Sequence, residues 1–334
     1  MEVSHIIVRK MRMLPFISLA ILLLVAELIA RSAGLHTPVL YERTAYGYRV
    51  APNQTLKRFG RAVAYNSQGL RSGPLSEAPD SGELRVLCLG DSITNGGTLT
   101  DQADTYPYRL ERELAGARVF NASAGGWALE NELGWLRVNG TFGASVVVLE
   151  VATHDLFQPP AGSELVGRHP SFPERAPALA LSELLLRYFL PWLGVGPSRI
   201  DPGAKGVEQS EADMERALAA LEALVRESRA LRAEPVVMFV EQPAVLERSD
   251  ALILEAKRRM RELLDRESVF LVETAPNVER QGGSALFRDG LHPNADGNAV
   301  LAKSVAPAVR AAVRRSPLQS AARTESREAG SRQN

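Results

Sequence analysis

The sequence predicts an α/β protein: a three-layer α/β/α sandwich with a five-stranded parallel sheet, preceded by an N-terminal transmembrane helix. Short, continuous apolar runs recur along the chain, as expected for strands that are buried on both faces. Helical patterns lie between these runs, and strands that alternate with helices form parallel βαβ units. A single long apolar run near the N-terminus has the composition of a membrane span.

The N-terminal apolar run covers 13–30 and follows Arg9, Lys10 and Arg12. A basic flank before an apolar helix stays in the cytoplasm, so the rest of the chain would cross the membrane. We interpret the run as an uncleaved signal anchor. A cleaved signal peptide and a soluble amphipathic helix are the alternatives. Either kind of signal would place the remaining chain on the periplasmic or extracellular side of the cytoplasmic membrane.

Five apolar runs and five helical patterns follow in alternation. The predicted strands are 85–89, 118–120, 145–151, 235–240 and 269–272. The predicted helices are 106–114, 128–138, 211–231, 252–264 and 299–313. The resulting organisation is a cytoplasmic N-terminus (1–12), the anchor (13–30), a lead-in or stalk (31–82), an α/β domain (83–315) with an insertion (157–210), and a disordered tail (316–334).

Inside the insertion, 178–193 is apolar but contains Glu183, Arg187 and Pro191. This pattern predicts an amphipathic helix that packs on the main domain. Lying on the membrane or covering a substrate cleft are the alternatives.

Composition excludes several classes of function. The 334 residues carry 39 basic and 39 acidic side chains, which argues against nucleic-acid binding by bulk charge. Cys88 is the only cysteine, so the chain forms no internal disulfide, and its sequence has no Cys/His cluster with zinc-ligand spacing. We therefore predict no metal and no cofactor.

Polar residues follow the first three predicted strands and precede the last helix. In parallel sheets, ligands bind beyond the carboxyl ends of the strands, so these residues are expected to meet. The first strand runs into Gly90, Asp91 and Ser92. A serine at this place is suited to act as a nucleophile, with its own N–H facing a developing oxyanion. A helix cap is the alternative for this serine.

A candidate base for that serine is His292, which ends the segment Asp289-Gly-Leu-His292 near the C-terminus. A serine hydroxyl needs an adjacent base, and histidine suits this task because its ordinary pKa lies near 7. Asp289 would hold the imidazole tautomer. A capping aspartate next to a surface histidine is the alternative interpretation.

Two further strand ends complete the predicted site. Asn121-Ala-Ser-Ala-Gly125-Gly126 follows the second strand, where a glycine lets a backbone N–H approach a ligand oxygen. His154 and Asp155 follow the third strand and would point a donor into the same crevice. A plain turn and a helix cap are the respective alternatives.

With these blocks in this order, the chain resembles the SGNH/GDSL hydrolases over 84–313. The resemblance implies a flavodoxin-like α/β/α fold and a metal-free serine esterase or acyl-transfer mechanism. It implies that Ser92, His292 and Asp289 form the catalytic triad, with Asp91 and Asp155 in support. Gly126, with Gly125 as the second choice, and Ser92 would be backbone oxyanion donors.

The third block departs from the family pattern, since Ala-Thr-His154-Asp155 stands where Gly-x-Asn-Asp is usual. His154 is therefore expected to replace the asparagine amide as an oxyanion donor, because an imidazole N–H can donate. A weakened oxyanion hole and a specialised acyl acceptor are the alternatives. This substitution bears on the rate more than on the reaction class.

The segments 46–53 and 66–71 resemble membrane-anchored bacterial members of the family, which are linked to envelope acyl groups. The expected function is a carbohydrate O-acyl (acetyl) esterase that faces the envelope and acts on a small-molecule or glycan ester. An O-acyltransferase, a lipase or thioesterase, and a catalytically silent glycan-binding module are the alternatives. The sequence does not predict an oligomeric state.

Overall fold

The computed structural model describes residues 2–76, 78–80, 82–196, 209–241 and 251–316, with side chains from residue 13 onward. Its central element is a five-stranded sheet in the order β6-β5-β7-β8-β9, with every neighbouring pair parallel. The strands are β5 (Leu84–Gly90), β6 (Ala117–Ser123), β7 (Val146–Ala152), β8 (Glu234–Val240) and β9 (Phe270–Glu273). The predicted five-stranded parallel sheet is confirmed, and each strand overlaps its predicted range.

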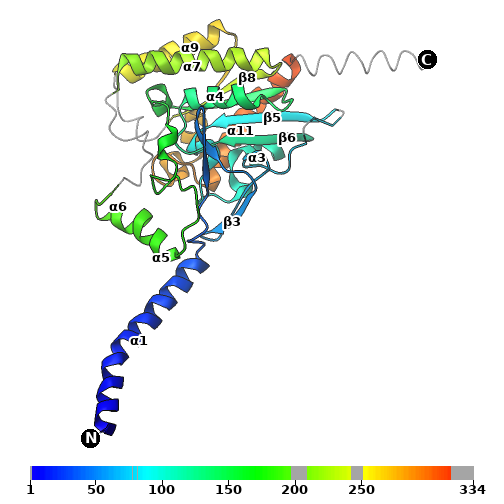
Figure 1. The fold of residues 1–334 in the computed structure, drawn as a ribbon. Coiled ribbons are helices and arrows are strands. Elements are labelled where there is room, and N and C mark those ends of the chain that lie inside the picture. The colour runs from blue at the N-terminus through cyan, green and yellow to red at the C-terminus, as the bar shows by residue number, and fades with distance from the viewer. Residues whose placement is uncertain (1, 77, 81, 197–208, 242–250, 317–334) are drawn as a thin grey trace, which may run out of the picture.

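Helices cover both faces of the sheet, which completes the predicted three-layer sandwich (Figure 1). One core joins the sheet to α4 (Leu129–Asn139), α7 (Glu211–Ala230) and α9 (Ala251–Arg266). The other joins it to α3 (Tyr106–Glu113), α10 (Ala275–Gln281) and α11 (Ala295–Arg315). Side chains alternate between these cores along each strand because the strand period is two residues.

Short elements lie in the connections between these helices and strands. They are α2 (Ser92–Asn95), η1 (Gln102–Asp104), η2 (Thr153–Leu156), η3 (Ser163–Leu165) and η5 (Gly283–Leu286). Neither α2 nor α10 was among the predicted helices, because one or two turns give too little apolar periodicity to recognise.

The segment interpreted as a lead-in or stalk (31–82) is instead packed against the sandwich. It forms two antiparallel hairpins, β1 (Tyr41–Thr44) with β2 (Gly47–Val50), and β3 (Gln54–Arg58) with β4 (Arg61–Tyr65). Side chains from both hairpins are buried in the core that holds α4 and α7, among them Tyr48, Val50, Val63 and Tyr65. Strands of four or five residues are too short for a clear alternating pattern, which is why the sequence suggested an extended stalk.

The N-terminal helix α1 (Glu2–Ser32) projects away from the sandwich (Figure 1). Within it, Met13–Ser32 is long and apolar enough to cross a membrane, and nearly all of it is exposed. A membrane anchor and a signal sequence both fit this description, so the compartment of the α/β sandwich stays a prediction.

The insertion contains the helix expected over 178–193. It is continuous through α5 (Ala180–Glu183), the π-helical turn η4 (Leu184–Phe189) and α6 (Leu190–Trp192). Most of the predicted tail, 317–334, lies outside the described residues, and so does 197–208 of the insertion.

Candidate active site

Gly90 and Asp91 place Ser92 at the carboxyl edge of the sheet. A Cβ on Gly90 would lie 2.1 Å from Thr94 Oγ1 and 2.8 Å from Glu150 Oε2, so no larger residue fits there without a shift. Asp91 then caps α2, because its Oδ1 accepts a hydrogen bond of 2.7 Å from the Ile93 N–H. Ser92 is the first residue of this helix, two positions after the last residue of the interior strand β5.

The structure brings the three residues of the predicted triad together. Nε2 of His292 lies 2.9 Å from Ser92 Oγ, across 200 positions of sequence. Nδ1 of His292 lies 2.9 Å from Asp289 Oδ2. The Asp289 Oδ1 also accepts the backbone N–H of His292 at 2.8 Å, which fixes the turn that carries both side chains. This chain of contacts is the arrangement in which an imidazole can remove a proton from a serine hydroxyl.

Asp289 is ionised in this arrangement. Partial burial alone would raise the pKa of its carboxyl group. The hydrogen bonds from the side chain and backbone of His292, together with the charge of that imidazole, outweigh burial and lower the pKa of Asp289 well below its usual range. The carboxylate can therefore stabilise a positive charge on His292.

The glycine loop after β6 lies beside the nucleophile. A Cβ on Gly125 would be 3.8 Å from Ser92 Cβ, so the Gly125–Gly126 peptide lies next to the serine. Gly126 has φ of +80°, which favours glycine, and its carbonyl accepts a hydrogen bond from the Gln158 side chain at 3.0 Å. The Gln158 side chain thus fixes the position of the glycine loop. These contacts position the loop but do not distinguish Gly126 from Gly125 as the donor.

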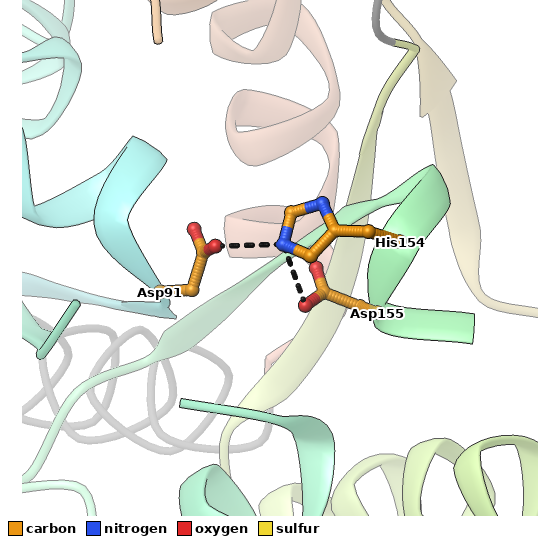
Figure 2. Close-up of side chains that lie close together, drawn as sticks. All are labelled: Asp91, His154 and Asp155. Carbon is orange, nitrogen blue, oxygen red and sulfur yellow. Dashed lines mark hydrogen bonds and ion pairs between the residues drawn. The ribbon is translucent and has the colours of Figure 1, made fainter. Parts of the chain in front are cut away.

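His154 is oriented differently from the expectation. Its Nε2 lies 3.0 Å from Asp91 Oδ2 and 3.4 Å from Asp155 Oδ1 (Figure 2). This nitrogen therefore faces two buried carboxylates, and the same Oδ2 of Asp91 also accepts a hydrogen bond from Ser92 Oγ at 3.3 Å. The contacts support a role for His154 in positioning Asp91, and they do not support donation from its Nε2 to an oxyanion.

The charge of Asp91 explains why His154 takes this orientation. Burial would raise the pKa of Asp91, but the hydrogen bond and charge of His154, the Ile93 N–H and the more distant His292 lower it. An ionised carboxylate can only accept hydrogen bonds, so Nε2 of His154 carries a hydrogen and donates it to Asp91 Oδ2. The nearest ligand atoms of Asp91, His154 and Asp155 all lie within 4.8 Å of one another, a spacing that a cation could also bridge. The direct contact satisfies the Asp91–His154 pair without a cation.

Two buried acids near this cluster were not singled out from the sequence. Glu132 on α4 and Glu150 on β7 are completely buried, and burial, followed by the nearby charges of Asp155 and Asp91, raises the pKa of both carboxyl groups well above the usual value. Glu150 Oε2 accepts a hydrogen bond from Thr94 at 3.1 Å. A glutamate inside a predicted strand run was the available signal, since β7 is otherwise apolar.

A cavity of about 500 Å³ opens onto Ser92 Oγ and the triad. Its walls come from the triad, the loop after α2, the β3–β4 turn and the insertion helix. The lining residues are Phe59, Ser92, Gly97, Thr98, Leu99, Ser171, Arg187, Tyr188, Arg288, Asp289 and His292. The space is large enough for a short acyl chain with part of its alcohol.

Several solved structures are similar to this chain. TesA is 18% identical, with 68% of this chain and 99% of TesA covered and a TM-score of 0.44. The acetylxylan esterase Axe2 of Geobacillus stearothermophilus is 17% identical (69% and 94% covered, TM-score 0.43). A GDSL-like lipase of Bacteroides thetaiotaomicron is 14% identical (71% and 93% covered, TM-score 0.44). Among curated proteins, none matches this chain.

The family model of the GDSL-like lipases and acylhydrolases matches residues 88–300. That range runs from β5 to α11 and contains Ser92, His154, Asp289 and His292. It covers well over half of the chain. The protein therefore belongs to the GDSL-like lipase/acylhydrolase family and is an ester hydrolase.

Proposed function

We propose that the protein is a membrane-anchored serine esterase that removes O-acyl groups from carbohydrates of the cell envelope. The observation that carries the proposal is the contact of 2.9 Å between Ser92 Oγ and His292 Nε2, with Asp289 on the other imidazole nitrogen. A hydroxyl, an imidazole and a carboxylate in this order are the parts of a nucleophilic acyl-transfer site.

In the proposed mechanism, Nε2 of His292 accepts the Ser92 proton as Oγ bonds to the ester carbonyl carbon. Asp289 holds the Nδ1–H and stabilises the imidazolium. The bond to the alcohol oxygen then breaks, and that oxygen takes the proton from Nε2. Water attacks the acyl-serine by the same route, which releases the acid and restores the free hydroxyl.

The developing oxyanion needs donors close to Ser92. We assign this role to the backbone N–H groups of Ser92 and Gly126, since the glycine loop lies beside the serine. Each such donor typically contributes roughly 3–4 kcal/mol to transition-state stabilisation. In this assignment Asp91, His154 and Asp155 hold the start of α2 in place without touching the oxyanion.

A carbohydrate ester suits the rim of the cavity. Thr98, Ser171 and Arg288 line it beside the triad and offer donors and acceptors for sugar hydroxyls. The resemblance to envelope-facing members of the family supports the same substrate class.

We further propose that α1 stays attached as the anchor. Glu27 and Arg31, within the span Met13–Ser32, form hydrogen bonds with backbone groups at the start of the helix in the insertion, residues 178–181. These contacts join α1 to the catalytic fold. The basic residues that precede the span favour a catalytic domain outside the cytoplasm. The intact mass of protein extracted from membranes tests this part, because a processed chain would lack the N-terminal residues.

The catalytic proposal is tested with Ser92→Ala and a short-chain aryl ester. The variant should fold normally by circular dichroism and lose hydrolysis and fluorophosphonate labelling. Retained activity would remove Ser92 from its role. Mass spectrometry of products formed with an added sugar acceptor then distinguishes hydrolysis from transfer, since transfer would yield a newly acylated sugar.

A further inference from the structure

The insertion carries a dense group of exposed apolar side chains. Eight large apolar residues in 179–195 are exposed, and Trp192, at 70%, is the most exposed of them. They are Leu179, Leu184, Leu185, Leu186, Phe189, Trp192, Leu193 and Val195. An apolar groove of about 470 Å³ runs between several of them. A surface of this kind normally binds another apolar phase or partner.

This apolar helix, 179–195, is attached to the end of the candidate membrane span. The carboxylate of Glu27 accepts the N–H groups of Ala180 at 2.8 Å and Leu181 at 2.9 Å, so it caps α5. Arg31 donates to the carbonyl of Ala178 at 2.8 Å. Figure 1 shows α5 next to the C-terminal end of α1, with α6 on the same side of the catalytic domain.

These contacts fix the depth of the apolar helix relative to the span. Glu27 precedes the last residue of the span, Ser32, by five positions, which is about 7.5 Å along a helix at 1.5 Å per residue. The start of α5 therefore lies level with the last two turns of α1, where Ala180 also packs against Ala30 and Leu35. If α1 fills the hydrocarbon layer, that level is the boundary between headgroups and acyl chains, where an amphipathic helix lies in the membrane plane.

We propose that the apolar helix is a second membrane contact, lying in the interfacial layer of the bilayer that α1 spans. The inference rests on the proposed anchor. The other side of the helix is polar and bound to the protein, as a membrane-surface helix requires. The buried Glu183 pairs with Arg58 at 2.6 Å, and Arg58 also donates to Tyr188 Oη at 3.2 Å.

The same helix forms one wall of the catalytic cavity, because Arg187 and Tyr188 line it together with Ser92. Membrane contact on one side of the helix thus brings the cavity next to the lipid surface. The substrate class that fits this placement is an ester carried by a membrane-bound amphiphile, such as an acylated glycan on a lipid. Placement of the cavity next to the lipid surface would not favour binding of a glycan that is free in solution.

Trp192 provides a direct test of docking. The chain has three tryptophans, and the other two, Trp127 and Trp135, are at most 2% exposed. The full chain is reconstituted in phosphatidylcholine–phosphatidylglycerol vesicles whose acyl chains are brominated near the glycerol end. The emission lost on Trp192→Phe substitution gives the Trp192 signal, and we expect bromine to quench most of it. A Trp192 signal that bromine leaves unchanged would overturn the docking.

A charge-insertion variant tests the consequence for catalysis. Leu185→Glu/Phe189→Glu should lower turnover of an acylated glycolipid in vesicles by about tenfold or more, because charged residues oppose interfacial burial. Hydrolysis of a soluble aryl ester should stay unchanged. Leu254→Glu on α9, another exposed leucine, is the matched control and should affect neither reaction. Equal loss on both substrates, or no loss, would refute a role for docking in substrate capture.

The two proposals fail in distinguishable ways. If the chain does not rise with the vesicles when they are centrifuged in a density gradient, the anchor and the docking are both wrong. If it floats but Trp192 can be cross-linked to a second copy and is not quenched by bromine, the apolar helix is a protein interface and only the docking is wrong. If Ser92→Ala retains esterase activity while Trp192 is quenched, the catalytic assignment fails and the docking stands.

Discussion

Replacing His154 by alanine separates a positioning role from an oxyanion role. In the structure Nε2 of His154 forms a hydrogen bond with the carboxylate of Asp91, whose side chain is only 1% exposed. A hydrogen bond to a buried charged group is typically worth about 1.5–3 kcal/mol. We therefore expect His154→Ala to lower the free energy of unfolding at pH 7 by about that amount. The rate should fall only about tenfold, through displacement of Ser92.

The effect on stability should depend on pH in a defined direction. His154 helps to lower the pKa of Asp91 below its unfolded value of about 3.9, so the stabilisation is present above that pH and is lost as the pH falls through the folded value. The difference between wild type and His154→Ala should therefore persist from neutral pH down to about pH 4 and shrink only below it.

The assay is denaturant unfolding at pH 7 and at about pH 2, below the unfolded pKa of an aspartate at about 3.9, alongside aryl ester kinetics. His154→Asn is the matched variant, because it restores the asparagine usual in this block while the shorter side chain loses the Asp91 contact. We expect it to behave like His154→Ala. If alanine instead lowers kcat by roughly 100- to 1,000-fold with unchanged stability, and asparagine rescues the rate, His154 is an oxyanion donor and the reasoning is refuted.

Three further outcomes follow from the site. Gly90→Ala should lower stability by about 1–3 kcal/mol and reduce esterase activity, because its Cβ would collide with Thr94; a thermal melt and the aryl ester assay check this. The free energy of unfolding of Glu132→Gln should increase relative to that of wild type by up to about 1.4 kcal/mol for each pH unit above pH 4.3. The reason is that the raised pKa of Glu132 makes the wild type lose stability as the pH rises. Unfolding measured from pH 4 to pH 8 tests this. Prolonged dialysis against a chelator should leave the esterase rate within about twofold, because the Asp91–His154 contact satisfies those groups directly.

The sequence was most informative where topology alone decides position. Ser92 and the glycine loop follow adjacent parallel strands, β5 and β6, so both had to reach the same edge of the sheet. His292 could be added because a serine needs a base and few histidines were available. The chemistry and the order of the motifs therefore predicted the contact that the structure contains.

The direction of His154 could not be predicted in this way. Its place after β7 was correct, but the orientation of its ring depends on Asp91 and Asp155, whose burial and charge emerge only in the folded protein. Glu132 was hidden for a related reason. A single glutamate in a helical pattern suggests an exposed position, and only the packing of α4 against the sheet makes it a buried acid.

The hairpins that replace the expected stalk connect α1 to the catalytic cavity. The guanidinium of Arg58 on β3 is fully buried and donates to the Gly34 carbonyl, just after α1, at 2.9 Å and to Glu183 on α5 at 2.6 Å. Next to it, Phe59 lines the cavity and packs edge-on against Tyr188. Breaking a buried ion pair from one side typically costs about 3–5 kcal/mol, so this junction resists hinging. The junction therefore fixes the orientation of α1 relative to the cavity wall. If α1 spans a membrane as proposed, this rigid connection would hold Ser92 at a constant height above the bilayer, which a flexible tether would not do.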